Sequence, residues 1–265
     1  MKVSRKYPSD LSFEQWEFLS RHLPKPSRWG RKPIDRRRIL DAIFYLLRTG
    51  CQWRMLPREF PCWSTVYGVF RQWRITGAWQ RIHAALVKWV RKRSGKKPTP
   101  TTAILDSQSI RTAEGGEERG YDSAKKITGR KRHIAVDTLG MVQAVVVHGA
   151  YWQDYDGACF VAQKLRQNCP RLKRIFADSI YRCNQLPQWM KAQHRYDLQI
   201  VKRPRSARGH FDPVPKRWIV ERTFAWIMRY RRNARDYERL TENGEAIIHA
   251  TMIQFVVRRF ENMQK

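Results

Sequence analysis

The spacing of the apolar residues changes at one short segment, residues 94–100 (SGKKPTP), which has no large apolar side chain and two prolines. Before this segment, apolar residues recur every three or four positions, which is the period of a helix. After it, short apolar runs alternate with helical patterns, which predicts strands and helices in turn. We therefore expect a helical domain over residues 1–93, a linker over 94–100 and an α/β domain over 101–265.

The N-terminal domain is expected to consist of four helices. Ser12 and Gln15 have the spacing of a capping box, and Pro24 stops the helix that follows. The other three expected helices cover Ile39–Leu47, Ser64–Trp73 and Ala78–Arg93. With its basic entry segment, this domain is expected to bind DNA in the manner of a helix-turn-helix.

The second domain is expected to form a mixed sheet with helices packed on it. Its first strand is a short apolar run, Thr102–Leu105, and a long polar stretch follows up to Gly129. Two strands, His133–Val136 and Val142–Val147, are joined by the turn sequence Asp137–Gly140. The remaining elements are expected in the order helix 156–167, strand 173–177, helix 186–192, strand 198–201, a helix around residue 221 and a final helix over 245–260.

The charge of the chain indicates its partner. The excess of 53 Lys and Arg over 23 Asp and Glu gives a net charge of +30, which favours a polyanion, and nucleic acid above all. A membrane partner is not expected, because no apolar stretch approaches the roughly 18 residues of a spanning helix. The five cysteines form no Cys-x-x-Cys pair, so reduced thiols and a cytoplasmic, nucleoid-associated location are expected.

Three carboxylates lie at informative places in this basic chain. Asp106 and Asp178 each follow an apolar run, and Glu221 lies within a basic amphipathic helix. Carboxylate oxygens are the ligands that Mg²⁺ prefers, and two such ions about 3.5–4 Å apart can cut and join phosphodiesters. Each residue also has a plain structural alternative: Asp106 as a strand end, Asp178 as a helix cap, and Glu221 as the partner of Arg217 four residues earlier.

Several segments resemble the DDE transposases of bacterial insertion sequences. The first catalytic block corresponds to residues 106–109 (DSQS), 120–122 (GYD) and 129–133 (GRKRH). Residues 177–178 with Tyr181 resemble the second block, and residues 217–226 (RWIVERTFAW) match the third closely. Residues 46–57 (LLRTGCQWRMLP) are similar to the helical domain of the insertion-sequence-five family.

This resemblance implies a ribonuclease-H-like fold and a transposase that cleaves and joins the ends of an insertion sequence. Asp106, Asp178 and Glu221 would be catalytic and would bind Mg²⁺ or Mn²⁺, with two ions expected. The chain departs from the family pattern at Val214 and Met228, which stand seven residues on either side of the Glu, and at Ser179-Ile180 after the second Asp. These departures keep open a relic that binds DNA without cutting it, and a structure-selective nuclease or resolvase is a further alternative.

Double-stranded DNA is the expected partner, as terminal inverted repeats and as target, with at least a homodimer on the DNA because one reaction recombines two ends. The residues expected to bind DNA are basic residues of three regions: Arg31, Lys32, Arg36, Arg37 and Arg38; Lys125, Lys126, Arg130, Lys131 and Arg132; and Arg217, Arg229 and Arg232. Trp218 and Trp226 are expected in the core, and His133 and His148 are expected to be structural.

Overall fold

A computed structural model describes residues 6–25, 34–113, 115–183, 185–201 and 216–264 of the 265-residue chain. The chain forms two compact units, each assembled from separate stretches of sequence. The first unit comprises Met1–Leu86, Ile227–Arg235 and Glu242–Lys265, and the second comprises Val87–Trp226 and Asp236–Thr241. The division of the chain into domains at residues 94–100 stays a prediction. None of the described helices is long and apolar enough to cross a lipid bilayer.

The first unit is helical. Its N-terminal helices are α1 (Phe13–Ser20), α2 (Arg36–Thr49), α3 (Trp63–Ile75) and the larger part of α4 (Ala78–Arg93), with the 3-10 turn η1 (Trp53–Met55) between α2 and α3. Ser12 and Gln15 make the predicted capping box at α1. Gly50 ends α2 in a left-handed conformation, φ 74°, which glycine adopts without the strain of a side chain.

The C-terminal helix α8 (Thr241–Gln264) contributes residues 242–264 to this helical unit. Phe260 stacks on Phe18 with the ring centroids 4.1 Å apart. The Gln254 side chain donates to the Ser9 carbonyl at 3.3 Å. The first unit therefore has a core to which both ends of the chain contribute.

The second unit is built on a six-stranded mixed sheet with the order β2-β3-β1-β5-β6, in which β4 also pairs with β3. The strands are β1 (Thr102–Arg111), β2 (Gly120–Asp122), β3 (Ile127–Val136), β4 (Val142–Gly149), β5 (Arg174–Ala177) and β6 (Asp197–Ile200). β1 runs antiparallel to β3 and parallel to β5, and β5 runs parallel to β6. This topology confirms the predicted mixed α/β sheet, and it is consistent with a ribonuclease-H-like fold.

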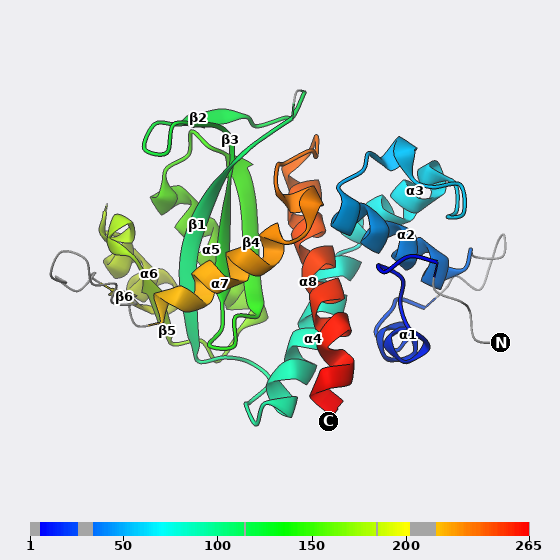
Figure 1. The fold of residues 1–265 in the computed structure, drawn as a ribbon. Helices are drawn as coiled ribbons and strands as arrows, with labels where there is room; N and C mark the ends of the chain where they lie inside the picture. Colours follow the sequence, from blue (N-terminus) through cyan, green and yellow to red (C-terminus); the bar gives the residue numbers. More distant parts are fainter. Residues whose placement is uncertain (1–5, 26–33, 114, 184, 202–215, 265) are drawn as a thin grey trace, which may run out of the picture. The chain divides into compact units, whose positions relative to one another are not determined.

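Helices cover both faces of this sheet (Figure 1). On one face, α5 (Asp154–Asn168) and α6 (Leu186–His194) share an apolar core with β1, β3, β4 and β5, which includes Leu105, Val161 and Ile175. On the other face lies α7 (Arg217–Met228), where the Thr223 hydroxyl donates to the Gly140 carbonyl at 2.9 Å. The 3-10 turn η2 (Ser179–Arg182) follows β5, and η3 (Arg231–Asn233) follows α7.

The turn between β3 and β4 confirms the predicted hairpin. The carboxylate of Asp137 accepts hydrogen bonds from the backbone N–H groups of Leu139 and Met141, at 2.9 and 3.0 Å. Gly140 has φ 84°, a conformation that side chains resist. Arg91 pairs with the buried Asp137 carboxylate and balances its charge.

Two predicted boundaries in this region are wrong. β1 continues to Arg111 instead of ending at Leu105, and the polar stretch contains β2 and the first part of β3. The strand persists through polar residues because β3 pairs with it over residues 104–111, which satisfies the backbone whatever the side chains are. The two strands approach so closely at Gly129 that a Cβ there would lie 1.9 Å from the Ile110 carbonyl oxygen.

Candidate active site

The sheet register brings Asp106 and Asp178 level with each other. β1 and β5 are parallel neighbours with Ile104 opposite Phe176, so two steps further along each strand lead to the two aspartates. Neighbouring strands are about 4.8 Å apart, and residues two apart share a face. Asp106 lies inside β1 just beyond the end of β5, and Asp178 is the first residue after β5. The two carboxylates therefore lie side by side on the α7 face of the sheet.

Helix α7 connects the third acid to this pair through an arginine. Arg217 is the first residue of α7, and Glu221 follows one turn later. The Arg217 guanidinium lies 3.6 Å from the Asp178 carboxylate and 3.2 Å from the Glu221 carboxylate. Arg217 thus links Glu221 on the helix to Asp178 beside the sheet, and its charge also acts on Asp106.

Two of the plain structural roles are realised alongside this arrangement. The Asp178 carboxylate caps η2, accepting the backbone N–H of Ile180 at 3.1 Å. Glu221 pairs with Arg217 at the expected i, i+4 spacing. Within the described part of the chain, no three His, Cys, Asp or Glu side chains gather closely enough to hold a metal ion. The three acids are thus brought together as a carboxylate–guanidinium cluster, and they do not form a ready-made metal cage.

The surroundings of the Asp106 side chain disfavour its charged form. Burial raises its pKa to about 6, and the Asp178 charge adds to the rise. The backbone N–H of Ser107 and the charges of Arg217 and Lys125 act in the opposite direction. A carboxylate in this state gains from any additional positive charge that comes within reach.

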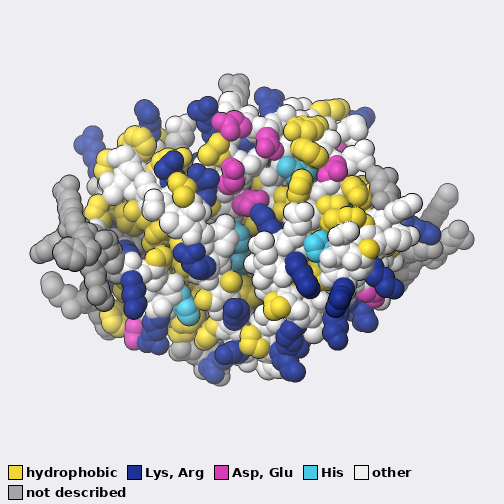
Figure 2. Space-filling model, turned by 180° about the vertical axis from the view of Figure 1, so that it is seen from behind, with side chains coloured by type: hydrophobic (Ala, Val, Ile, Leu, Met, Phe, Trp, Pro, Cys, Tyr) yellow, Lys and Arg dark blue, Asp and Glu magenta, His cyan; other side chains and the backbone are white. Residues whose placement is uncertain are grey.

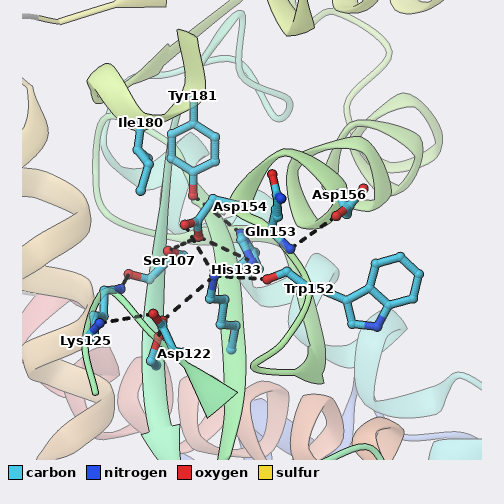
Figure 3. A network of polar contacts seen from close by, with 12 residues as sticks. Ser107, Asp122, Lys125, His133, Trp152, Gln153, Asp154, Asp156, Ile180 and Tyr181 are labelled. Atoms are coloured by element: carbon cyan, nitrogen blue, oxygen red, sulfur yellow. Dashed lines mark hydrogen bonds and ion pairs between the residues drawn. The ribbon is translucent and has the colours of Figure 1, made fainter. Parts of the chain in front are cut away.

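A second polar network lies beside these acids, on neighbouring residues of β1 and β3 (Figure 3). The Ser107 hydroxyl donates to the Asp154 carboxylate at 2.7 Å, at the start of α5. Lys131 lies 3.4 Å from Asp154 and 3.8 Å from Asp122. The buried Tyr181 hydroxyl lies 3.4 Å from the His133 ring. This network fixes the strand that carries Asp106 and the turn that follows Asp178.

Ser107 belongs to the block 106–109, but its pairing with Asp154 could not be predicted from the sequence, since only folding joins residues 47 positions apart. The buried His133 is structural, as expected, and burial holds its pKa well below the usual value. His148 is also buried and stacks on the His133 ring with the centroids 4.9 Å apart. Both imidazoles therefore belong to the support of the site.

A cavity of about 320 Å³ opens next to this network. Lys125 and Lys131 line it together with the partly exposed rings of Tyr121, Tyr151 and Trp152. Lys125 also connects the cavity to the acids, because its charge acts on Asp106. The cavity is therefore lined by members of the second polar network, Asp122, Lys131 and Asp154, and not by the three acids themselves.

Four basic residues expected to contact DNA turn out to be buried. Arg130, Lys131, Arg132 and Arg232 have 0, 6, 2 and 5% of their surface exposed. Arg130 and Arg132 lie 3.3 and 3.9 Å from the Asp236 carboxylate. Arg232 donates to the Cys51 carbonyl at 3.0 Å. The expectation is corrected for these four, because their charges balance buried acids or bind carbonyls inside the protein.

Other predicted basic residues remain open to solvent. Lys125, Lys126, Arg38 and Arg229 are exposed, and Arg217 is part of the acidic cluster. Arg36 and Arg37 are half-buried and bind backbone carbonyls of Pro24 and Leu11. Arg31 and Lys32 lie outside the described residues. Figure 2 shows Lys and Arg side chains spread over the visible face, while many of its acidic side chains gather near the upper centre.

The departures from the family pattern have a mixed outcome. Ser179 and Ile180 are part of η2, and neither has a positive φ, so the β-branched Ile180 meets no backbone strain there. Val214 lies outside the described residues.

Trp226 is buried as expected, but Trp218 is 47% exposed, with the Arg222 guanidinium 4.5 Å from its ring centroid. The core prediction for Trp218 is therefore wrong.

Comparison with known proteins agrees with this fold. Residues 97–255 match the family described as "Transposase DDE domain", and residues 11–83 match "Putative transposase of IS4/5 family (DUF4096)". A Burkholderia cepacia protein named "Insertion element IS402 uncharacterized 16.2 kDa protein" is 35% identical over 114 residues, 40% of this chain and 76% of that protein.

The fold and the family match define a nucleic-acid-processing enzyme of the DDE class, a class that generally uses divalent metal ions. The chain belongs to the transposase DDE domain family, of IS4/5-like type, and its partner is DNA.

Proposed function

We propose that the chain cleaves and joins the ends of its insertion sequence, and that Asp106, Asp178 and Glu221 are its catalytic residues. The observation that carries the proposal is that Asp178, at the end of β5, and Glu221, on α7, share one guanidinium, while Asp106 lies beside Asp178 on the neighbouring strand β1. Residues 72 and 43 positions apart have no structural need to meet around a single charge. A site that cleaves phosphodiesters with two metal ions does need carboxylates that lie close together.

The donor set fits hard divalent cations. All three side chains offer carboxylate oxygens, which Mg²⁺ and Mn²⁺ prefer over His or Cys ligands. Burial is the main cause of the raised pKa of Asp106, and the neighbouring Asp178 charge adds to it, so a cation at this place would stabilise the charged carboxylate. When bound, two such ions would activate the attacking water or 3′ hydroxyl and neutralise the leaving oxygen.

The other residues of the cluster would hold the DNA strand in place. Lys125 is exposed, and its charge acts on Asp106, so it can meet a phosphate next to the acids. Arg217 can meet another phosphate from the start of α7. Ser107 and Asp154 would keep β1 rigid beneath the scissile bond, because their hydrogen bond ties the strand to α5.

The test is cleavage of a duplex that carries the ends of the element, in Mg²⁺ and in Mn²⁺. Asp178→Asn keeps the shape and the capping oxygen but removes the charge. We expect it to lower the cleavage rate by at least about a hundredfold, since loss of groups that only support metal ligands already costs 10–100-fold. Asp197→Asn is the matched control, because Asp197 is an exposed acid of β6 that pairs with Arg174. Unchanged cleavage by Asp178→Asn would refute the proposal.

A second candidate is a relic that binds DNA without cutting it. The absence of a three-residue metal group among the described residues favours it. The relic would retain duplex binding but give no cleavage product at any concentration of Mg²⁺ or Mn²⁺. A nuclease or resolvase of the same fold would release cleaved ends without joining them to a target.

We further propose that DNA is bound as a homo-oligomer, at least a dimer, since joining two ends requires two sites. Within the IS4/5-like group, the segment 46–57 favours the insertion-sequence-five family. Of the described basic residues that were expected to bind DNA, Arg38, Lys125, Lys126 and Arg229 are exposed. Size measurement of the complex with end-bearing DNA tests the oligomeric state.

A further inference from the structure

The position of Arg217 is unusual for a residue that is to bind DNA. Its guanidinium lies between Asp178 and Glu221, and its side chain is only 14% exposed. Its Nε is buried and has no hydrogen-bond partner among the described residues. A cation that satisfied a permanent ion pair would be expected to use this donor too.

The two contacts of Arg217 are loose. Charge-assisted hydrogen bonds between guanidinium and carboxylate are about 2.7–2.9 Å long, whereas the separations here are 3.6 and 3.2 Å. The Glu221 side chain is also 54% exposed, so water screens its pairing. Arg217 therefore neutralises the acids without being locked onto them.

The Arg217 guanidinium competes with any other cation for the carboxylate oxygens of Asp178 and Glu221. We propose that Arg217 is a built-in counter-cation, which occupies the metal-facing oxygens of Asp178 and Glu221 in the DNA-free protein and leaves them for a DNA phosphate. The planar guanidinium can bind two oxygens of a phosphate in a bidentate manner, including through the Nε that lacks a partner among the described residues. The inference rests on the proposed function of the acids.

This exchange links two binding events. DNA that draws Arg217 away exposes two carboxylates, which then hold divalent cations more tightly. By reciprocity, bound cations favour the Arg217 position on the DNA. Until a substrate strand is present, Arg217 offsets part of the negative charge of Asp178 and Glu221, and the site holds divalent cations weakly.

The experiment measures metal binding, not activity, on the full-length protein. Mn²⁺ binding without DNA is followed by the electron paramagnetic resonance signal of the free ion, for wild type, Arg217→Gln and Arg174→Gln. Arg174 is the matched control, since it also lies 3.6 Å from a single carboxylate, Asp197, and is half exposed. A unit charge about 4 Å away contributes at least about 1 kcal/mol even in water, so Arg217→Gln should tighten Mn²⁺ binding at least about fivefold. Arg174→Gln should leave it unchanged.

A second measurement uses the wild type alone and does not depend on the folding of a variant. Fe²⁺ with ascorbate and peroxide cleaves a polypeptide near the bound metal, and the fragments locate the site. With a 20-base-pair duplex at low salt, cleavage near residues 106, 178 and 221 should rise several-fold over the DNA-free protein. Arg217→Gln should give the higher level without DNA.

The outcomes separate the inference from the proposed function. The inference is overturned if Arg217→Gln binds Mn²⁺ as wild type does, or if the duplex leaves iron cleavage unchanged, while Asp178→Asn and Glu221→Gln weaken metal binding. If the two acid variants bind Mn²⁺ as well as wild type, the proposed function fails and takes the inference with it. Tighter binding in Arg217→Gln together with a DNA effect in wild type supports the inference.

Discussion

Arg130 allows the most direct test of whether the buried basic residues stabilise the protein or contact DNA. It is fully buried in β3 and donates to the carbonyls of Glu238 and Arg239, at 2.8 and 2.6 Å, and to that of Glu117. Its guanidinium also pairs with Asp236 at 3.3 Å. These bonds tie residues 236–241 to the sheet. Arg130 therefore holds the second unit together instead of facing DNA.

Replacing Arg130 by Met should remove a large share of the folding free energy. Removing one partner of a buried ion pair costs about 3–5 kcal/mol, and each buried carbonyl left without a donor adds about 1–3 kcal/mol. We expect a loss of about 4 kcal/mol or more, against a total of about 5–15 kcal/mol for a typical protein. Urea unfolding followed by circular dichroism measures it.

Two controls make the result decisive. Lys125→Met removes an exposed basic side chain on the neighbouring turn, and should change stability by no more than about 0.5 kcal/mol. Asp236→Asn should cost less in the Arg130→Met background than in wild type, because the pair is already broken. Arg130→Met with wild-type stability but weaker DNA binding would show that the residue is a DNA contact after all.

Two further predictions concern exposed and buried charges. Lys125→Gln should weaken duplex binding and lower the slope of log affinity against log salt by about one, with wild-type stability; an unchanged slope would remove Lys125 from the DNA surface. Burial raises the pKa of Asp41 to about 7, while its carboxylate accepts the Leu11 N–H at 2.8 Å. The folded protein then keeps a proton that the unfolded chain releases near pH 4, so Asp41 favours folding at low pH and loses this contribution as pH rises to 7, by at most about 1.4 kcal/mol per pH unit. Asp41→Asn keeps the acceptor and cannot ionise, so its stability relative to wild type should increase from pH 4 to pH 7 in urea titrations; a constant difference would contradict the raised pKa.

Local signals in the sequence were sufficient for the elements with local causes. The helix from Ala78 to Arg93, the capping box at Ser12 and the hairpin turn at Asp137–Gly140 all depend on residues within a few positions of each other, and the structure confirms them.

Features that depend on contacts between residues far apart in the sequence could not be predicted from it. The run Arg130–Arg132 looks like a solvated basic patch until Asp236, more than a hundred residues later, is brought to it. β1 looks finished at Leu105 because only its pairing with β3 carries it through polar residues. The meeting of Asp106 and Asp178 was anticipated from their places in the chain, but the guanidinium between Asp178 and Glu221 is a consequence of packing.

The helical unit that joins both ends of the chain has a consequence during synthesis. The ribosome releases residues 1–86 on the order of ten seconds before α8, at about 5–20 residues per second. Until then, Phe18 lacks the ring of Phe260, and His83 lacks the His249 imidazole that lies 3.0 Å away in the finished unit. A prematurely terminated product that stops before α8 would expose these surfaces to proteases. The helical unit is therefore finished only after α8 has been synthesised.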